Sequence, residues 1–220
     1  MRIHPSILSA DFGYFAAELE SISSADSAHV DVMDNHFVPN LTFGLPVVKR
    51  LQEISPIPLD VHLMIERADS EAPKYADLGV DSVTFHLEAA SQPIELARRI
   101  KSAGSKAAVA IKPKTGVDQV LDLLGEVDML LIMTVEPGFG GQPLLEETLT
   151  KVAEAHKFIE ESGKKVMLQV EGGVTELNIG RIAALGANSF VAGSAVFSAA
   201  DRTERIASLR SAAQAGANSQ

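Results

Sequence analysis

Short apolar runs alternate with longer amphipathic stretches along most of the chain. The apolar runs are rich in Val, Ile, Leu and Met, and a run of this length with apolar residues on both faces is typical of a covered strand. They predict strands over residues 3–8, 28–33, 59–64, 82–86, 106–111, 129–133, 166–170 and 189–192. The stretches between them repeat with helical spacing and predict helices over residues 15–23, 72–78, 94–103, 117–124, 145–162 and 178–185.

Eight strands that alternate with helices indicate eight consecutive βα units. In a chain of 220 residues this arrangement predicts an α/β fold with a single, compact (β/α)₈ TIM barrel. A doubly wound open sheet is the alternative, but the turn after its first strand would be rich in glycine. Here that turn reads Ser9-Ala10-Asp11-Phe12. We expect one barrel domain over residues 1–211 and a flexible C-terminal tail over residues 212–220.

Titratable side chains stand at the ends of the second and third predicted strands, where the active site of a TIM barrel lies. His29 and Asp31 are two residues apart on one strand, so they project to the same side. His62 occupies the comparable place on the next strand. A single histidine on a strand is commonly a hydrogen-bonded core residue. Two on adjacent strands, one of them beside a carboxylate, instead indicate a metal site.

Glu171 extends this set because it directly follows the seventh predicted strand, at the same rim of the barrel. The alternative for Glu171 is an exposed loop acid, but Gly172 and Gly173 beside it favour a site that something approaches closely. His29, Asp31, His62 and Glu171 would form a mixed nitrogen and oxygen ligand set. Such a set suits one divalent ion of Zn, Fe, Mn or Co and is poor for Ca²⁺.

Glycine-bearing turns follow the last three predicted strands. In TIM barrels the loops after strands seven and eight commonly bind phosphate through backbone N–H groups. We therefore expect a phosphate-binding region built by these turns. Its candidate residues are Gly138, Phe139, Gly140, Gly141, Gly172, Gly173, Gly193 and Ser194.

Three of the six methionines, Met33, Met64 and Met133, end strands two, three and six. Methionine is a common core filler, but three at one rim predict an apolar collar that excludes water from the reacting atom.

Composition narrows the classes of function. The net charge of −10, without a long block of like charge, argues against nucleic-acid or anionic-membrane binding. The absence of cysteine excludes disulfides, a thiolate nucleophile and thiolate metal ligands. With no signal-peptide core and no apolar stretch of membrane-spanning length, the cytoplasm is the expected location.

Several segments together resemble the ribulose-phosphate 3-epimerase family. They are Pro5-Ser6-Ile7-Leu8-Ser9-Ala10-Asp11-Phe12, the run from His29-Val30-Asp31 to Val38-Pro39-Asn40, Asp60-Val61-His62-Leu63-Met64, the 137–142 loop and Val191-Ala192-Gly193-Ser194-Ala195. The resemblance covers almost the whole chain in order, and its second segment is highly specific.

The resemblance implies a TIM barrel of the ribulose-phosphate-binding type that interconverts D-ribulose 5-phosphate and D-xylulose 5-phosphate in the pentose phosphate pathway. It implies a divalent metal at the four residues named above, and sugar contacts from Ser6 and His62. It places the phosphate at the glycine turns. A homo-oligomer is a further expectation from the resemblance.

One residue departs from the family pattern. The end of the seventh strand reads Val-Asp-Gly-Gly in the family, and here it reads Val170-Glu171-Gly172-Gly173. Glutamate moves the carboxylate outward by one methylene, roughly 1.5 Å. A tolerated natural variant, a weakened enzyme and a deliberate substitution remain open at this point.

The implied reaction inverts the carbon beside a ketone through a cis-enediolate. Asp31 and Glu171 would then be the catalytic pair, with Asp31 removing a proton from one face and Glu171 supplying one on the other. A metal would stabilise the negative charge as a Lewis acid.

Three alternatives stay open. An epimerase for a six-carbon phosphoketose would use the same metal site. A decarboxylase of the phosphate-binding barrel type would need an Asp-x-Lys at the end of strand three, where His62 stands instead. A barrel that binds a sugar phosphate without catalysis is the third.

Overall fold

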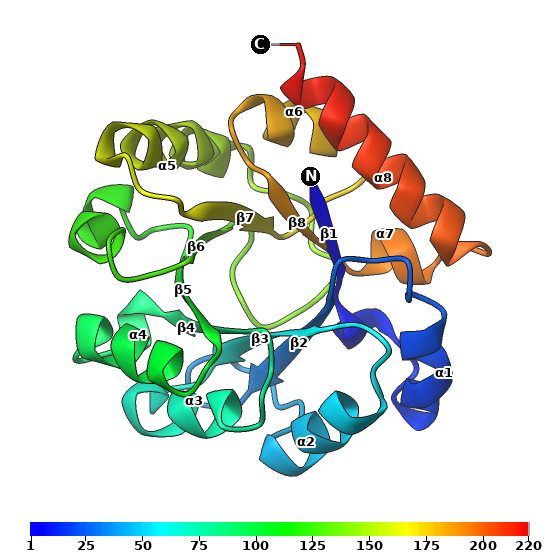
Figure 1. Cartoon of the computed structure of the whole chain (residues 1–220). Coiled ribbons are helices and arrows are strands. Elements are labelled where there is room, and N and C mark those ends of the chain that lie inside the picture. Colours follow the sequence, from blue (N-terminus) through cyan, green and yellow to red (C-terminus); the bar gives the residue numbers. More distant parts are fainter. Residues whose placement is uncertain (220) are drawn as a thin grey trace.

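The computed structural model describes residues 1–219, and its eight parallel strands form a nearly closed barrel (Figure 1). The strands are β1 (Arg2–Pro5), β2 (Ala28–Met33), β3 (Leu59–Met64), β4 (Ser82–His86), β5 (Lys106–Ile111), β6 (Met129–Met133), β7 (Met167–Glu171) and β8 (Ser189–Ala192). From β2 to β8 each strand pairs with the next one in the chain, and β8 pairs with β1. A parallel bridge between Ser6 and His29 joins β1 to β2. The predicted (β/α)₈ architecture is confirmed.

Helices surround the barrel and cover the outer faces of its strands (Figure 1). They are α1 (Phe15–Glu20), α2 (Leu45–Ile54), α3 (Ala68–Ala76), α4 (Pro93–Ser102), α5 (Leu149–Ser162), α6 (Ile179–Ala184), α7 (Ser194–Phe197) and α8 (Arg202–Ala217). Between β5 and β6 the connection is the 3₁₀ helix η4 (Val117–Leu123) in place of the expected α-helix. Helices α2, α7 and α8 had no counterpart among the sequence predictions.

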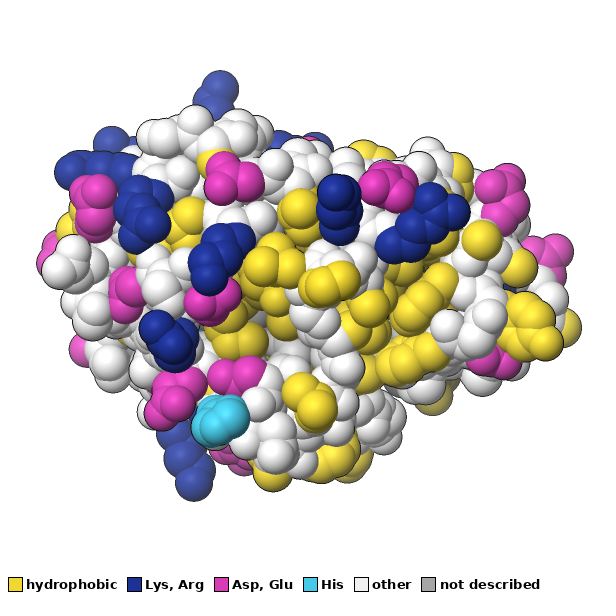
Figure 2. All heavy atoms as spheres, turned by 90° about the horizontal axis from the view of Figure 1, so that it is seen from below, with side chains coloured by type: hydrophobic (Ala, Val, Ile, Leu, Met, Phe, Trp, Pro, Cys, Tyr) yellow, Lys and Arg dark blue, Asp and Glu magenta, His cyan; other side chains and the backbone are white. Residues whose placement is uncertain are grey.

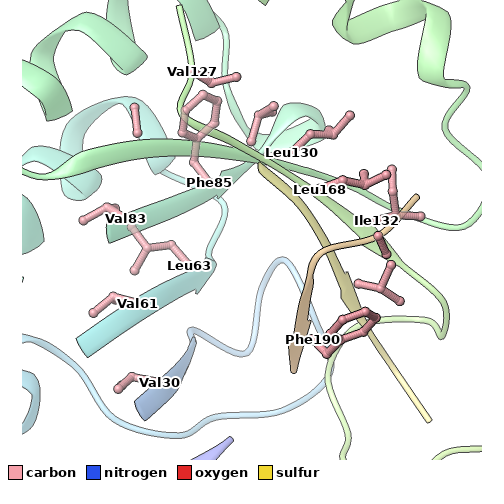
Figure 3. Close-up of a cluster of buried hydrophobic side chains, with 14 of the residues drawn as sticks. Val30, Val61, Leu63, Val83, Phe85, Val127, Leu130, Ile132, Leu168 and Phe190 are labelled. Atoms are coloured by element: carbon pink, nitrogen blue, oxygen red, sulfur yellow. The ribbon is translucent and has the colours of Figure 1, made fainter. Parts of the chain in front are cut away.

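The two faces of each strand have different surroundings. The outward residues are aliphatic or aromatic and pack against the helices, and Figure 3 labels Val30, Val61, Leu63, Phe85 and Phe190 in this layer. The alternate residues point into the barrel. The expectation that most strands are apolar on both faces holds for β5 and β6, whereas β2, β3 and β4 each place polar residues inward.

The first strand is shorter than the predicted 3–8, because the chain leaves the sheet after Ser6. The Ser6 hydroxyl accepts a hydrogen bond from the Leu8 N–H at 3.3 Å and caps the 3₁₀ helix η1 (Ile7–Ser9). A side chain that hydrogen-bonds to a nearby backbone N–H competes with strand pairing. Here the Ser6 cap starts a 3₁₀ helix where the strand was expected to continue.

The predicted flexible tail at 212–220 is wrong for residues 212–217, which complete helix α8. Ala213 is fully buried, and α8 lies along α6 (Figure 1). The two helices approach closely because Gly180 faces Gly216, and a Cβ on Gly216 would collide with the Gly180 backbone. Small residues that resemble a frayed end in the sequence form the contact here. Gln220 lies outside the described residues.

Figure 2 shows one face of the molecule, on which basic and acidic side chains are interspersed around hydrophobic ones. Within residues 1–219 no helix is both long enough and apolar enough to span a bilayer.

Candidate active site

The site begins with the alternation of residues along β2 and β3. His29 and Asp31 point into the barrel because Val30 and Val32 belong to the outer core. The parallel register pairs Asp31 with His62, so three polar side chains meet on two adjacent strands. All three are essentially fully buried.

Glu171, at the end of β7, completes the cluster from across the barrel mouth. Its Oε2 lies 3.2 Å from His29 Nε2 and 3.0 Å from His62 Nδ1. Asp31 Oδ1 lies 3.4 Å from His29 Nε2 and 3.6 Å from His62 Nδ1. One ligand atom from each of the four residues therefore lies within 4.8 Å of every other. The structure brings together the four residues that the sequence analysis proposed as metal ligands.

These same four atoms lack hydrogen-bond partners. Within the described residues, six buried side-chain polar atoms are unpaired, and four of them are His29 Nε2, Asp31 Oδ1, His62 Nδ1 and Glu171 Oε2. A buried polar atom without a partner costs free energy, so four such atoms aimed at one point indicate a position that binds a ligand. In a tetrahedral site with bonds near 2.1 Å, the ligand atoms are about 3.4 Å apart, close to the distances found here. The cluster fits a divalent ion.

The electrostatics of the cluster agree with a cation at its centre. Burial opposes a charge on His62, but Glu171 and Asp31 outweigh it and raise its pKa to about 9. His29 is likewise buried, and Asp31, Glu171 and Asp60 raise its pKa well above the usual value. Burial also opposes ionisation of Asp31, whereas the two imidazoles hold its pKa far below its ordinary range. The carboxylates therefore favour positive charge at the centre of the cluster. In the metal-free chain, protons on the two imidazoles supply that charge.

Asp60 holds the outer side of His29, and the sequence analysis assigned it no role. Its Oδ2 lies 2.8 Å from His29 Nδ1, and its Oδ1 accepts a hydrogen bond from Ser82 at 2.6 Å. Gln169 donates a further hydrogen bond to Asp60 at 3.0 Å. An ionised carboxylate only accepts, so Nδ1 carries a proton, and Nε2 is the nitrogen that would present a lone pair to a bound ion. The spacing of Asp60 and His62, two apart on β3, already placed both inside the barrel.

A cavity of about 310 Å³ opens above the cluster. Its wall includes the residues expected to bind substrate at the barrel mouth and the methionine collar. They are Ser6, Met33, Met64, Met133, Gly138, Phe139, Gly140, Gly141, Gly172, Gly173, Gly193 and Ser194, together with Asp31 and Glu171. The imidazoles of His29 and His62 are fully buried and do not belong to this wall. Sugar contact through His62 therefore stays a prediction.

The glycine turns close one side of the cavity. Gly173 has a φ of +64°, and a Cβ there would meet the backbone of Leu144 and Gln142. A Cβ on Gly193 would lie 2.6 Å from Ser9 Oγ. Gly173 therefore excludes a side chain, and at Gly193 a side chain would displace the Ser9 hydroxyl, so the loops after β7 and β8 approach the cavity at backbone level. Asn40 Nδ2 donates a hydrogen bond to Gly138 O at 2.7 Å and so anchors the 137–142 loop.

Ser6 reaches the cluster directly. Its hydroxyl donates a hydrogen bond to Asp31 Oδ2 at 2.5 Å, which leaves Oδ1 as the free oxygen of that carboxylate. Of the other histidines, His4 is buried and bonded to two serines, as a structural role predicts. His86 is also buried and contacts His62 instead of lining the cavity.

Comparison with known proteins gives a consistent result. The model of the "Ribulose-phosphate 3 epimerase family" matches residues 2–197. A ribulose-phosphate 3-epimerase of Mycobacterium tuberculosis is 48% identical over 217 residues, covering 99% of this chain and 94% of its own. One from Escherichia coli is 43% identical over 212 residues, covering 95% of this chain and 94% of its own.

The fold is shared more widely. The crystal structure of KGPDC from Streptococcus mutans in complex with D-R5P superposes with a TM-score of 0.73 at 15% identity, covering 97% of each chain. The 3-hexulose-6-phosphate synthase from Salmonella typhimurium gives 0.69 at 17% identity, covering 97% of this chain and 99% of its own. Likeness at this level of identity shows the barrel alone. The family match, the near-complete coverage and the high identity together show that this chain belongs to the ribulose-phosphate 3-epimerase family of isomerases.

Proposed function

We propose that this chain interconverts D-ribulose 5-phosphate and D-xylulose 5-phosphate by metal-dependent inversion at carbon 3. One observation carries the proposal. Four buried, unpaired ligand atoms converge beneath a cavity whose wall includes the two carboxylates of the set, Asp31 and Glu171. Family membership supports the reaction class, and the geometry supports the roles of individual residues.

His29, Asp31, His62 and Glu171 would hold the ion, and the two histidines are the neutral ligands of the set. When bound, a divalent ion of Zn, Fe, Mn or Co supplies Lewis-acid stabilisation of negative charge on the substrate oxygens. Asp60 supports this role because it holds His29 with Nε2 directed at the site.

Asp31 and Glu171 are the proposed base and acid. Asp31 takes the proton of carbon 3 from one face, and Glu171 returns a proton to the other face of the enediolate. The roles reverse in the back reaction. Ser6 fixes one oxygen of Asp31 by its 2.5 Å hydrogen bond and so restricts the orientation of the base. Each such group contributes about 10²–10⁴-fold in rate.

The rest of the cavity suits a sugar phosphate. The loops after β6, β7 and β8 present backbone groups where the phosphate would lie, and Met33, Met64 and Met133 line the reacting end. An apolar wall there excludes water from the carbanionic carbon.

Glu171 suits the site at its full length. Its Oε2 already lies near 3 Å from both histidine nitrogens, so the longer side chain reaches the cluster without a gap. These distances support the interpretation of Glu171 as a natural variant to which the rest of the site is adapted. Glu171→Asp should therefore withdraw the carboxylate and lower the rate by about 10²-fold, as a misplacement near 1 Å does.

The test measures exchange of the carbon-3 proton of ribulose 5-phosphate with solvent deuterium by NMR. Protein stripped with a chelator is compared with protein reloaded singly with Zn²⁺, Mn²⁺, Co²⁺ or Fe²⁺. We expect no exchange in the stripped protein and exchange with xylulose 5-phosphate formation after reloading. Metal binding without exchange would show a sugar-phosphate-binding barrel, and faster turnover of allulose 6-phosphate would show a six-carbon epimerase.

The expected homo-oligomer is a further part of the proposal. Phe12 and Tyr14 of the β1–α1 segment are 45% and 69% exposed, and such large apolar side chains are common at subunit contacts. Light scattering coupled to size-exclusion chromatography measures the assembly.

A further inference from the structure

His62 has an outer partner of its own, different from the one that holds His29. Its Nε2 lies 2.9 Å from His86 Nε2, and the two rings stack with centroids 5.0 Å apart. His86 Nδ1 in turn lies 3.3 Å from Glu88 Oε2. A chain of three side chains therefore runs from the ligand cluster outward through β4 to the segment that follows it.

The two ends of this chain determine where its protons lie. His62 Nδ1 is unpaired and faces Asp31 and Glu171, so in the metal-bound protein it would present its lone pair to the ion. A neutral imidazole carries one N–H, which places the proton of His62 on Nε2. That N–H donates to His86 Nε2, and the proton of His86 then lies on Nδ1. The ionised Glu88 carboxylate accepts the hydrogen bond from this N–H.

The far end is anchored by the backbone. Glu88 Oε1 accepts a hydrogen bond from the Lys112 N–H at 2.8 Å and another from the Thr115 hydroxyl. A backbone N–H can only donate, so the group at Oε1 has to be an acceptor. This contact fixes the orientation of the Glu88 side chain and leaves Oε2 for His86.

We infer that Glu88 is a positioning residue of the metal site, acting through His86 to keep the Nδ1 lone pair of His62 directed at the ion. The inference rests on the proposed metal site and adds the residue that sets the tautomer of its second histidine. Glu88 touches neither the cluster nor the main cavity wall. Partners of this kind typically change metal affinity by about 10- to 100-fold when altered.

The substitution Glu88→Gln separates positioning from packing. The Gln carbonyl must face the Lys112 N–H, so its NH₂ group points at His86 Nδ1, which then has to accept. Every hydrogen bond in the chain reverses, and the proton of His62 moves to the nitrogen that faces the cluster. This near-isosteric change should weaken metal binding by about 10- to 100-fold.

Glu88→Ala removes the same carboxylate without forcing the reversal. Glu88 lines an open surface cavity of about 520 Å³, so water can reach His86 Nδ1 and accept its proton. The direction of the chain is then retained. A positioning role predicts that Gln weakens metal affinity more than Ala does. A packing role predicts the opposite order.

The experiment measures dissociation constants for Zn²⁺ by competition with a chromogenic chelator, on wild type, Glu88→Gln, Glu88→Ala and Glu66→Gln. Glu66 lines the same surface cavity, so Glu66→Gln is the matched control and should retain wild-type affinity. Nitrogen-15 NMR of the zinc-loaded wild type should show His62 protonated at Nε2 and His86 protonated at Nδ1.

The outcomes decide the inference separately from the function. Weaker binding in Glu88→Gln than in Glu88→Ala, with the expected tautomers, supports it. Equal affinities in all variants, a weaker Glu88→Ala or the opposite wild-type tautomers overturn it and leave the proposed reaction standing. A wild type that binds no divalent ion overturns the metal site and this inference together. If Glu88→Gln does not fold, the wild-type tautomers decide the question.

Discussion

The two sides of the barrel interior have opposite character. On β2 and β3 the inward residues include His29, Asp31, Asp60 and His62, which are buried and polar. On β5 and β6 they include Ala110, Leu131 and Met133, which form a small apolar cluster of their own. The outward faces of the same strands do not differ in this way, because all of them contribute to the apolar layer beneath the helices.

This contrast shows how a closed barrel separates stability from chemistry. The outer layer must be apolar everywhere, because helices cover every strand. The inner face has no such demand, and a polar group is tolerated there if a partner satisfies it. On the polar side the partners are other side chains, except at the three atoms of His29, Asp31 and His62 that point toward Glu171. The apolar side fills the space opposite and excludes water.

The largest expected effect comes from the polar side. Asp31→Asn removes the proposed base and should lower the rate at saturating metal by about 10²–10⁴-fold. The variant should retain the circular dichroism spectrum of the wild type. Asp81→Asn, at an exposed ion pair with Lys106, is the matched control and should keep full activity. Wild-type turnover by Asp31→Asn would refute the assignment of the base.

A substitution on the apolar side should act on stability instead. Leu131→Ala leaves a cavity in the interior and should lower the free energy of unfolding by about 2–5 kcal/mol. Urea denaturation measures the loss. The dissociation constant for Zn²⁺ should change little, because Leu131 contributes no ligand atom. A large loss of metal affinity with unchanged stability would erase the proposed division between the two sides.

His4 on β1, which also points into the barrel, should make the stability sensitive to acid. This residue is buried between Ser27 and Ser189, and burial lowers its pKa from about 6.5 to about 4, against the opposing effect of Asp60. Between these two values only the unfolded chain binds the proton, so stability falls as the pH falls from 6.5 toward 4. The contribution is on the order of 3 kcal/mol.

The measurement compares metal-free wild type with His4→Gln by urea denaturation across that pH range. The variant should lose less stability on acidification, because its side chain does not titrate. His86, whose pKa burial also lowers to about 4, is present in both proteins and gives a common slope. Identical slopes would show that His4 does not carry this linkage.

The smallest effect is expected at the surface, outside both sides of the barrel interior. Leu177, which follows β7, is 98% exposed and contributes nothing to the interior. Leu177→Ala should change the free energy of unfolding by less than about 0.5 kcal/mol and leave metal affinity unaltered. A melting temperature several degrees below that of the wild type would reveal a contact that this contrast omits.

Much of the fold and the ligand set could be predicted from local pattern. Six of the eight strands have the expected bounds. A buried strand can be predicted because its run of apolar residues is confined to the strand itself. The pairing of His29 with Asp31 followed from the two-residue repeat of a strand. The tail prediction was wrong because Ala213 and Gly216 acquire a role only when α6 lies against them.

The sequence by itself determined which side chains face inward on each strand, since alternation is a property of the local backbone. Only the tertiary structure decided that Glu171 would come within 3.2 Å of His29, a residue far away in the chain, because closing the barrel sets distances between strands. It also decided the chain from His62 through His86 to Glu88 and Lys112. Hydrogen-bond direction depends on which groups meet, and no periodicity in the sequence records that.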